Sequence, residues 1–168
     1  ILTPSKFKQG ATNLTLILTN KRYDASFGTD NRGTKFNGPF QINAGISNNA
    51  LLKNYERIGL QSGVTSNTNE LKFFSGFFEQ PIYSEGTKLF LSGSFSDSEP
   101  GSELKSFEVK GESKTFKLKI THPFIRSRSE NLNGFIGYTN RDSETEILGK
   151  LDSEDRLRIF NLGASYDF

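Results

Sequence analysis

The sequence predicts an all-β chain, an antiparallel meander of about eight strands that is part of a transmembrane β-barrel. Apolar and polar residues alternate in segment after segment, and a period of two is the period of a strand. The composition, with 16 Phe and 16 Gly in 168 residues, suits strands packed side by side. Turn residues separate the segments at a spacing of about ten to twenty residues, the rhythm of a meander.

The clearest unit is the stretch 116–138, in which two alternating runs flank an arginine-rich turn. We expect two antiparallel strands here, the first ending at Pro123 because proline cannot donate a hydrogen bond to the ladder. The turn between them carries Arg126 and Arg128. The other six strands of the meander are expected at residues 22–29, 40–47, 56–65, 71–80, 88–96 and 156–168.

Other parts of the chain depart from this rhythm. Residues 1–9 show no clear period, and residues 11–19 read as one further strand before the meander. The segment 71–80 has phenylalanines on both parities, so we expect a bulge, a contact on the inner side of a barrel or an aromatic girdle. The charged stretches 97–113 and 140–155 predict two long polar loops.

No catalytic or metal-binding pattern emerges, so the chain is expected not to be an enzyme and to need no cofactor or metal. It has no cysteine and one histidine, His122, for which a structural or interfacial role is expected. The acidic stretches 97–103 and 142–146 lack the ligand spacing of a calcium loop and predict solvated loops. A net charge of +2 with interspersed signs gives no indication of nucleic-acid binding.

In the predicted strands, the polar residues that alternate with the apolar ones are candidates for lining a pore. They are Asp24, Gln41, Asn43, Arg57, Gln61, Lys117 and Lys119. In a barrel this parity would face the interior, whereas in a soluble sandwich it would face bulk water. The aromatic content of the apolar parity, and the lack of helices to cover it, favour the barrel.

The ordered motifs of the chain resemble a known family. PFIRSRSENLNGFIGYTNRDS and the following LGKLDSEDRLRIFNLGASYDF are similar to the transporter component of bacterial two-partner secretion systems. These are the haemolysin activator and filamentous-haemagglutinin secretion proteins of the Omp85 superfamily. GATNLTLILTNKRYDASFGTDNRGTKFNGPFQINAGISNN resembles the end of a second POTRA domain running into the first two barrel strands, and PIYSEGTKLFLSGSFSDSEPG resembles the fourth and fifth strands.

The resemblance implies a fold, a place and a function. Residues 1–20 would be the tail of a POTRA-like periplasmic domain, and residues 21–168 a segment of a transmembrane barrel in the bacterial outer membrane. Members of the family export a large exoprotein partner from periplasm to cell surface. Outer-membrane lipid and the barrel assembly machinery are the other partners implied. Counting strands from a periplasmic start puts the turn with Arg126 and Arg128 on the periplasmic side.

Two other readings stay open at this point. The ending NLGASYDF looks like an assembly signal, so a self-contained eight-stranded outer-membrane barrel serving as anchor or adhesin is one alternative. A soluble β-barrel or sandwich acting as a binding module is the other. The chain starts at Ile1 without a signal peptide, and from this we expect a processed or excised piece of a longer protein.

Overall fold

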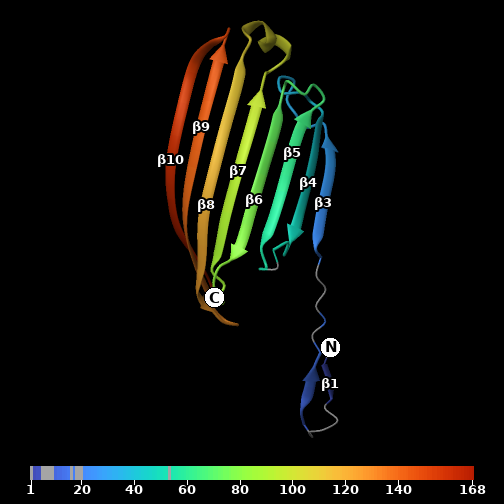
Figure 1. Ribbon diagram of the computed structural model, residues 1–168, viewed down its shortest axis with the longest axis vertical. Helices are drawn as coiled ribbons and strands as arrows, with labels where there is room; N and C mark the ends of the chain where they lie inside the picture. Colours follow the sequence, from blue (N-terminus) through green and yellow to red (C-terminus); the bar gives the residue numbers. More distant parts are fainter. Residues whose placement is uncertain (1, 5–9, 16, 18–20, 53) are drawn as a thin grey trace.

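A single antiparallel sheet of eight strands makes up most of the molecule in the computed structural model, which describes residues 2–4, 10–15, 17, 21–52 and 54–168 (Figure 1). Each strand pairs with the next along the chain, so the predicted all-β meander is confirmed. The strands are β3 Tyr23–Asp30, β4 Gln41–Asn49, β5 Arg57–Thr65, β6 Lys72–Pro81, β7 Lys88–Ser98, β8 Lys110–Arg126, β9 Asn131–Ile147 and β10 Lys150–Asp167.

A small hairpin precedes the sheet. Strand β1, Leu2–Pro4, pairs with β2, Thr12–Leu14, and it lies beyond the end of the sheet at which β3 begins (Figure 1). The predicted strand 11–19 is therefore found only at residues 12–14, and residues 16, 18 and 19 of that prediction lie outside the described residues. Strand β1 was missed because residues 1–9 carry no alternation.

The sheet is open and forms one layer. Its edges are β3 and β10, which do not pair with each other in the part of the chain that the structure describes. Among those residues no apolar side chain is buried, and no second sheet covers either face. The eight strands thus neither close on themselves nor form a sandwich.

The connections differ between the two ends of the sheet (Figure 1). The turns 50–56, 82–87 and 127–130 lie at the end where β3 begins, which we call the turn end. The connections 31–40, 66–71, 99–109 and 148–149 lie at the opposite end, the loop end. Among the described residues no helix is long and apolar enough to cross a membrane.

The prediction that Pro123 ends its strand is wrong. Strand β8 continues to Arg126, and the register shifts between Pro123 and Ile125, where Phe124 is the additional residue. A bulge leaves a backbone position without a ladder partner, so proline is tolerated there without ending the strand.

The prediction of a long loop at 140–155 is also wrong. Strands β9 and β10 are paired through this stretch and are joined by Leu148 and Gly149 alone. Both residues have positive φ, 53° and 70°, which is the backbone of a tight type I′ hairpin turn. Charged residues occupy both faces here, so the apolar alternation that reveals a half-buried strand is missing.

The other expected long loop, 97–113, is shorter than predicted. Strand β7 runs to Ser98 and β8 starts at Lys110, leaving a connection that contains the 3-10 helix η1, Ser102–Phe107. This connection is tied to its neighbours. The Gly101 N–H donates to the Phe36 carbonyl at 2.7 Å, and the Glu99 N–H donates to the Asn69 carbonyl at 3.0 Å. The connections 31–40, 66–71 and 99–109 therefore form one hydrogen-bonded cap at the loop end.

The phenylalanines of β6 occupy both faces without a bulge. Pairing of β6 with β5 and β7 continues without a register shift, so the expected bulge is absent from this strand. Phe73 and Phe77 lie on one face and Phe74 and Phe78 on the other. Each pair contributes to a different surface, as described below.

Candidate pore-lining face

The register of the sheet brings the seven predicted pore-lining residues onto one face, which we call the polar face. Cross-strand partners in a sheet point to the same side. Asp24 pairs with Ser47 and Ser47 with Gly59, which shares its face with the neighbouring Arg57 and Gln61. By the same chain of pairs this face also carries Gln41, Asn43, Lys117 and Lys119.

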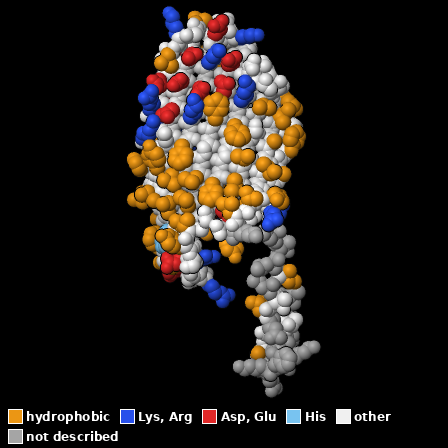
Figure 2. Space-filling view, in the orientation of Figure 1, with side chains coloured by type: hydrophobic (Ala, Val, Ile, Leu, Met, Phe, Trp, Pro, Cys, Tyr) orange, Lys and Arg blue, Asp and Glu red, His pale blue; other side chains and the backbone are white. Residues whose placement is uncertain are grey.

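The opposite face, the apolar face, exposes large hydrophobic side chains. Phe27 is 75% exposed, and Phe160 and Leu162 are 78% and 85% exposed. Figure 2 shows such side chains gathered in a broad band over the lower part of the sheet, with charged side chains above it. Large contiguous apolar surfaces are rare on soluble monomers, and a lipid-facing surface needs such a band.

Aromatic and cationic side chains pack together on the polar face. The Phe77 ring lies 6.3 Å from the Phe90 ring, and the Arg57 guanidinium lies 5.3 Å from the centroid of Phe77. Gly59 makes room for this arrangement, because a Cβ on Gly59 would come within 2.2 Å of Phe77 Cε1. Sequence reasoning missed this cluster, although phenylalanines on both parities of β6 were its signal.

A second cluster of the same kind lies farther along the sheet. The Lys119 ammonium lies 4.3 Å from the centroid of the Phe135 ring, close enough for a cation–π interaction. Gly163 leaves space for that ring, since a Cβ there would approach Phe135 Cε1 at 2.6 Å. The polar face is therefore a mixture of cations, amides and ring surfaces, with glycines beneath the rings.

Asp24 and Gln61 lie at a hollow of about 140 Å³ near the turn end of β3 to β5, with Ser26 and Arg57 also lining it. Just before β3, the Lys21 ammonium contacts the Asp24 carboxylate at 2.9 Å. The polar face thus has both charge signs where β3 begins.

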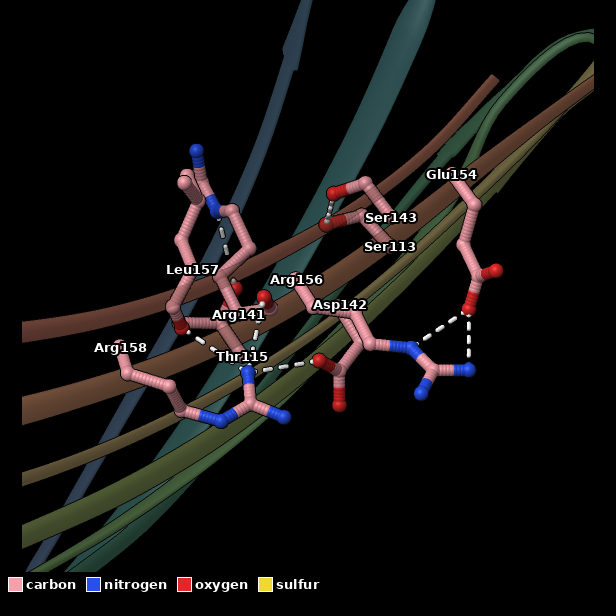
Figure 3. Close-up of polar contacts among 9 residues, drawn as sticks. All are labelled: Ser113, Thr115, Arg141, Asp142, Ser143, Glu154, Arg156, Leu157 and Arg158. Carbon is pink, nitrogen blue, oxygen red and sulfur yellow. Dashed lines mark hydrogen bonds and ion pairs between the residues drawn. The ribbon is translucent and has the colours of Figure 1, made fainter. Parts of the chain in front are cut away.

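Hydroxyl groups continue the polar face along the longest strands. Ser113 and Ser143 hydroxyls lie 3.0 Å apart, and Arg141 Nε donates to the Thr115 hydroxyl at 3.3 Å (Figure 3). These side chains satisfy one another across β8 and β9. On β8 and β9 the face consequently stays polar as far as Gly111 and Thr145, near the loop end.

Glu56 organises the turn between β4 and β5. Its side chain is 1% exposed, and its carboxylate accepts hydrogen bonds from the N–H groups of Leu52 and of Asn54, the latter at 2.9 Å. Burial raises the pKa of the carboxyl. The backbone N–H donors of Leu52, Glu56 and Asn54 together lower the pKa by more than burial raises it, so the pKa lies below its usual range. The turn is therefore built around a charged carboxylate.

Arg126 and Arg128 lie at the turn end, the end beyond which the β1 and β2 hairpin lies (Figure 1). Arg126 ends β8 and Arg128 is in the turn, which is closed by the Ser127 N–H donating to the Glu130 carbonyl at 2.9 Å. Neither arginine forms an ion pair within the described part of the chain. The sheet does not bring these two residues together with the seven on the polar face.

His122 lies on the apolar face near the turn end. Its Nδ1 lies 2.7 Å from the hydroxyl of Thr87, which is 6% exposed, and its ring meets Phe124 edge-on at 4.8 Å. These contacts join the turn before β7 to strand β8. No group of side chains suited to a metal ion occurs among the described residues.

Comparison with known proteins identifies relatives of this chain. Residues 12–168 match the family model of the haemolysin secretion/activation proteins ShlB/FhaC/HecB. Two curated sequences of the heme/hemopexin transporter protein HuxB from Haemophilus influenzae are 24% identical over 161 residues, which is 95% of this chain and 28% of theirs. The chain thus spans less than a third of the length of these relatives.

The solved structure of CdiB from Escherichia coli has the same fold. It matches 99% of this chain with a TM-score of 0.80 and 22% sequence identity, and the matched region is 32% of its own length. The family model covers nearly the whole chain and agrees with the resemblance found in its motifs. The chain therefore belongs to the haemolysin secretion/activation protein family ShlB/FhaC/HecB.

Proposed function

We propose that the sheet β3 to β10 is one wall of a pore in the bacterial outer membrane, through which a two-partner secretion transporter exports a large exoprotein to the cell surface. The observation that carries the proposal is the division of one sheet into two faces. Seven polar or charged residues lie on one face, while large apolar side chains are exposed on the other. A wall between lipid and an aqueous channel needs this division.

The mixed character of the polar face suits an unfolded polypeptide. Hydroxyl, amide and cationic groups offer hydrogen bonds to an extended backbone, and the Phe77 and Phe135 rings offer weak apolar contacts. Such a surface lets many different sequences slide past, because no single contact is strong.

The remaining parts take complementary roles in this proposal. The apolar face contacts outer-membrane lipid, and the barrel assembly machinery inserts the sheet. Residues 1–20 form the tail of a POTRA-like periplasmic domain, which places the turn end in the periplasm and the loop end at the cell surface. The HuxB relatives are named as heme/hemopexin transporters, and for this chain the transported molecule is proposed to be a secreted protein.

Conductance of the full-length parent protein in planar bilayers tests the proposal. Lys117 and Lys119 are on the polar face of β8, so the double variant K117E/K119E should make the pore more cation-selective, since lumen charges tune selectivity. Lys72 lies on the apolar face of β6, and K72E serves as the matched control with little change expected. Absence of conductance, together with normal export after removal of residues 23–167, would end the proposal.

A further inference from the structure

The apolar face changes character toward the loop end of β8, β9 and β10. These strands have 17, 17 and 18 residues, whereas about ten residues cross a membrane. Above Phe116, Tyr138 and Phe160 the outward positions become charged, as the upper part of Figure 2 shows. We call this area the charged rungs. It consists of Glu112, Lys114, Asp142, Glu144, Glu154, Arg156 and Arg158, which line a hollow of about 250 Å³.

The two charge signs are ordered along the strands. The cations Lys114, Arg156 and Arg158 lie nearest the apolar band, with Asp142 between them. One rung farther out, Glu112 pairs with Glu144. Glu144 in turn pairs with Glu154, so three carboxylates stand side by side on adjacent strands. Like charges directly opposite each other are unfavourable in a sheet, so this order needs a reason.

Ion pairs within the charged rungs leave the cations accessible. Arg158 binds the Asp142 carboxylate at 2.7 Å, and Arg156 Nε binds Glu154 at 2.6 Å (Figure 3). Lys114 pairs with Glu112, and its ammonium lies 5.9 Å from the Phe95 ring at the edge of the apolar band. The side chains of Lys114 and Arg156 remain 65% and 69% exposed. Each cation can therefore accept a further anionic partner.

Their height places these cations beside lipid headgroups. Arg158 is two residues from Phe160, which is about 7 Å along a strand. The headgroup layer extends about 5 to 8 Å beyond the hydrocarbon on each side of a bilayer. With the apolar band in the hydrocarbon, Arg158 and Lys114, each two residues beyond an aromatic residue of the band, are at the depth of lipid phosphates. Arg156 lies two residues farther out than Arg158, where Glu154 pairs with it.

We propose that the charged rungs bind lipopolysaccharide of the outer leaflet, with Lys114, Arg156 and Arg158 as the contacts to its phosphate groups. This inference rests on the proposed outer-membrane location. The outward face of β9 stays polar from Asn140 to Glu146, about 20 Å of strand, which is far more than a phospholipid headgroup covers. A lipid with a long phosphorylated saccharide head matches both the height of this surface and its cations.

The test is retention of lipopolysaccharide by the full-length parent protein purified from outer membranes. The variant K114Q/R156Q/R158Q should retain less, about fivefold less for each cation removed. The control K117Q/K119Q/R141Q removes three cations from the polar face of β8 and β9 and should retain the normal amount. Heat-modifiable gel mobility verifies that each variant is folded.

The charge-conserving variant K114R/R156K/R158K keeps the measurement decisive if the neutral variant fails to fold. It should bind lipopolysaccharide in nanodiscs and lose binding in high salt, because exposed charge contacts are screened. Equal binding to nanodiscs of phosphatidylglycerol alone, or equal retention by the neutral and control variants, would overturn the inference. Conductance of the same samples separates the two proposals. If the neutral variant conducts normally and retains as much lipopolysaccharide as the parent, the lipid site is wrong while the proposed pore stands.

Discussion

The ring of Phe77 occupies the space that a side chain on Gly59 would need, with Cε1 of the ring 2.2 Å from the position of a Cβ. This relationship ties two neighbouring strands of the polar face together. Arg57, two residues before Gly59, then lies over the same ring. One glycine thus sets the position of a phenylalanine and, through it, of a cation of the candidate pore.

Replacing that glycine should disturb the polar face. We expect G59A to displace the Phe77 ring and to lower the free energy of unfolding by about 1 to 3 kcal/mol, the usual cost of overpacking. Urea unfolding in detergent measures the change. Gly28 lies on the same face of β3 with nothing within 4 Å of its added Cβ, so G28A is the matched control and should unfold near the parental midpoint.

Cysteine labelling should separate the two faces of the sheet. The chain has no cysteine of its own, so single cysteines can be placed without background. A membrane-impermeant maleimide should label N43C and Q61C on the polar face. It should leave the adjacent I42C and L60C unlabelled, because they lie on the apolar face, which the proposal covers with lipid. Labelling of all four positions to the same degree would be incompatible with a wall between lipid and water.

The turn at Glu56 should loosen in acid. Its carboxyl has a lowered pKa in the folded protein, so its contribution to stability is present above the pKa of the unfolded chain and disappears as pH falls through the folded pKa. On acidification, amide hydrogen exchange at Leu52 and Asn54 should therefore slow less than the intrinsic pH dependence of exchange predicts, because their protection is lost. In E56Q the exchange should already be fast at neutral pH, and unchanged protection in that variant would contradict the role given to the charge.

The hydrogen bond between Thr87 and His122 should stabilise the junction of β7 and β8. T87V keeps the shape of the side chain and removes the hydroxyl, which should cost about 1 kcal/mol. T87S retains the hydroxyl and is the control expected to keep most of the stability. Thermal unfolding followed by gel mobility compares the three proteins, and equal midpoints for T87V and the parent would show that the contact contributes nothing.

Charge reversal at the turn end tests the role of the two arginines. R126E/R128E should reduce export of the partner by the full-length parent, if these exposed cations meet anionic groups at the membrane face or on the periplasmic domain. Lys150 lies at the loop end, at the start of β10, so K150E is a control at the opposite end of the sheet. Normal export by R126E/R128E would leave the turn with a purely structural role.

Alternation of apolar and polar residues was sufficient to predict the strands that cross the apolar band. The clean alternation at residues 40–47 corresponds to β4. The register places Asn43 on the polar face and Ile42 on the apolar face, as the alternation predicts. In this region one face of the sheet is apolar and the other is polar, so the residue type changes at every second position.

Above the apolar band the same rule fails for a physical reason. At Asp142 and Ser143 both faces are polar, so the alternation is one of charge against hydroxyl and reads as a loop. Strand structure there depends on pairing with β8 and β10. The partners of Asp142, for example, are Lys114 and Arg156, which a local reading of the sequence does not connect with it. Leu148 and Gly149 gave a weak turn signal, because leucine rarely adopts the positive φ that the tight turn requires.

The upper border of the sheet is sloped, higher at β10 than at β3 (Figure 1). Strand length rises from 8 residues in β3 to 11 in β7 and 18 in β10. A polypeptide moving along the polar face would lose contact beside β3 long before it lost contact beside β10. The rim of such a channel is lower on the side of β3, so the emerging chain would leave sideways across the short strands.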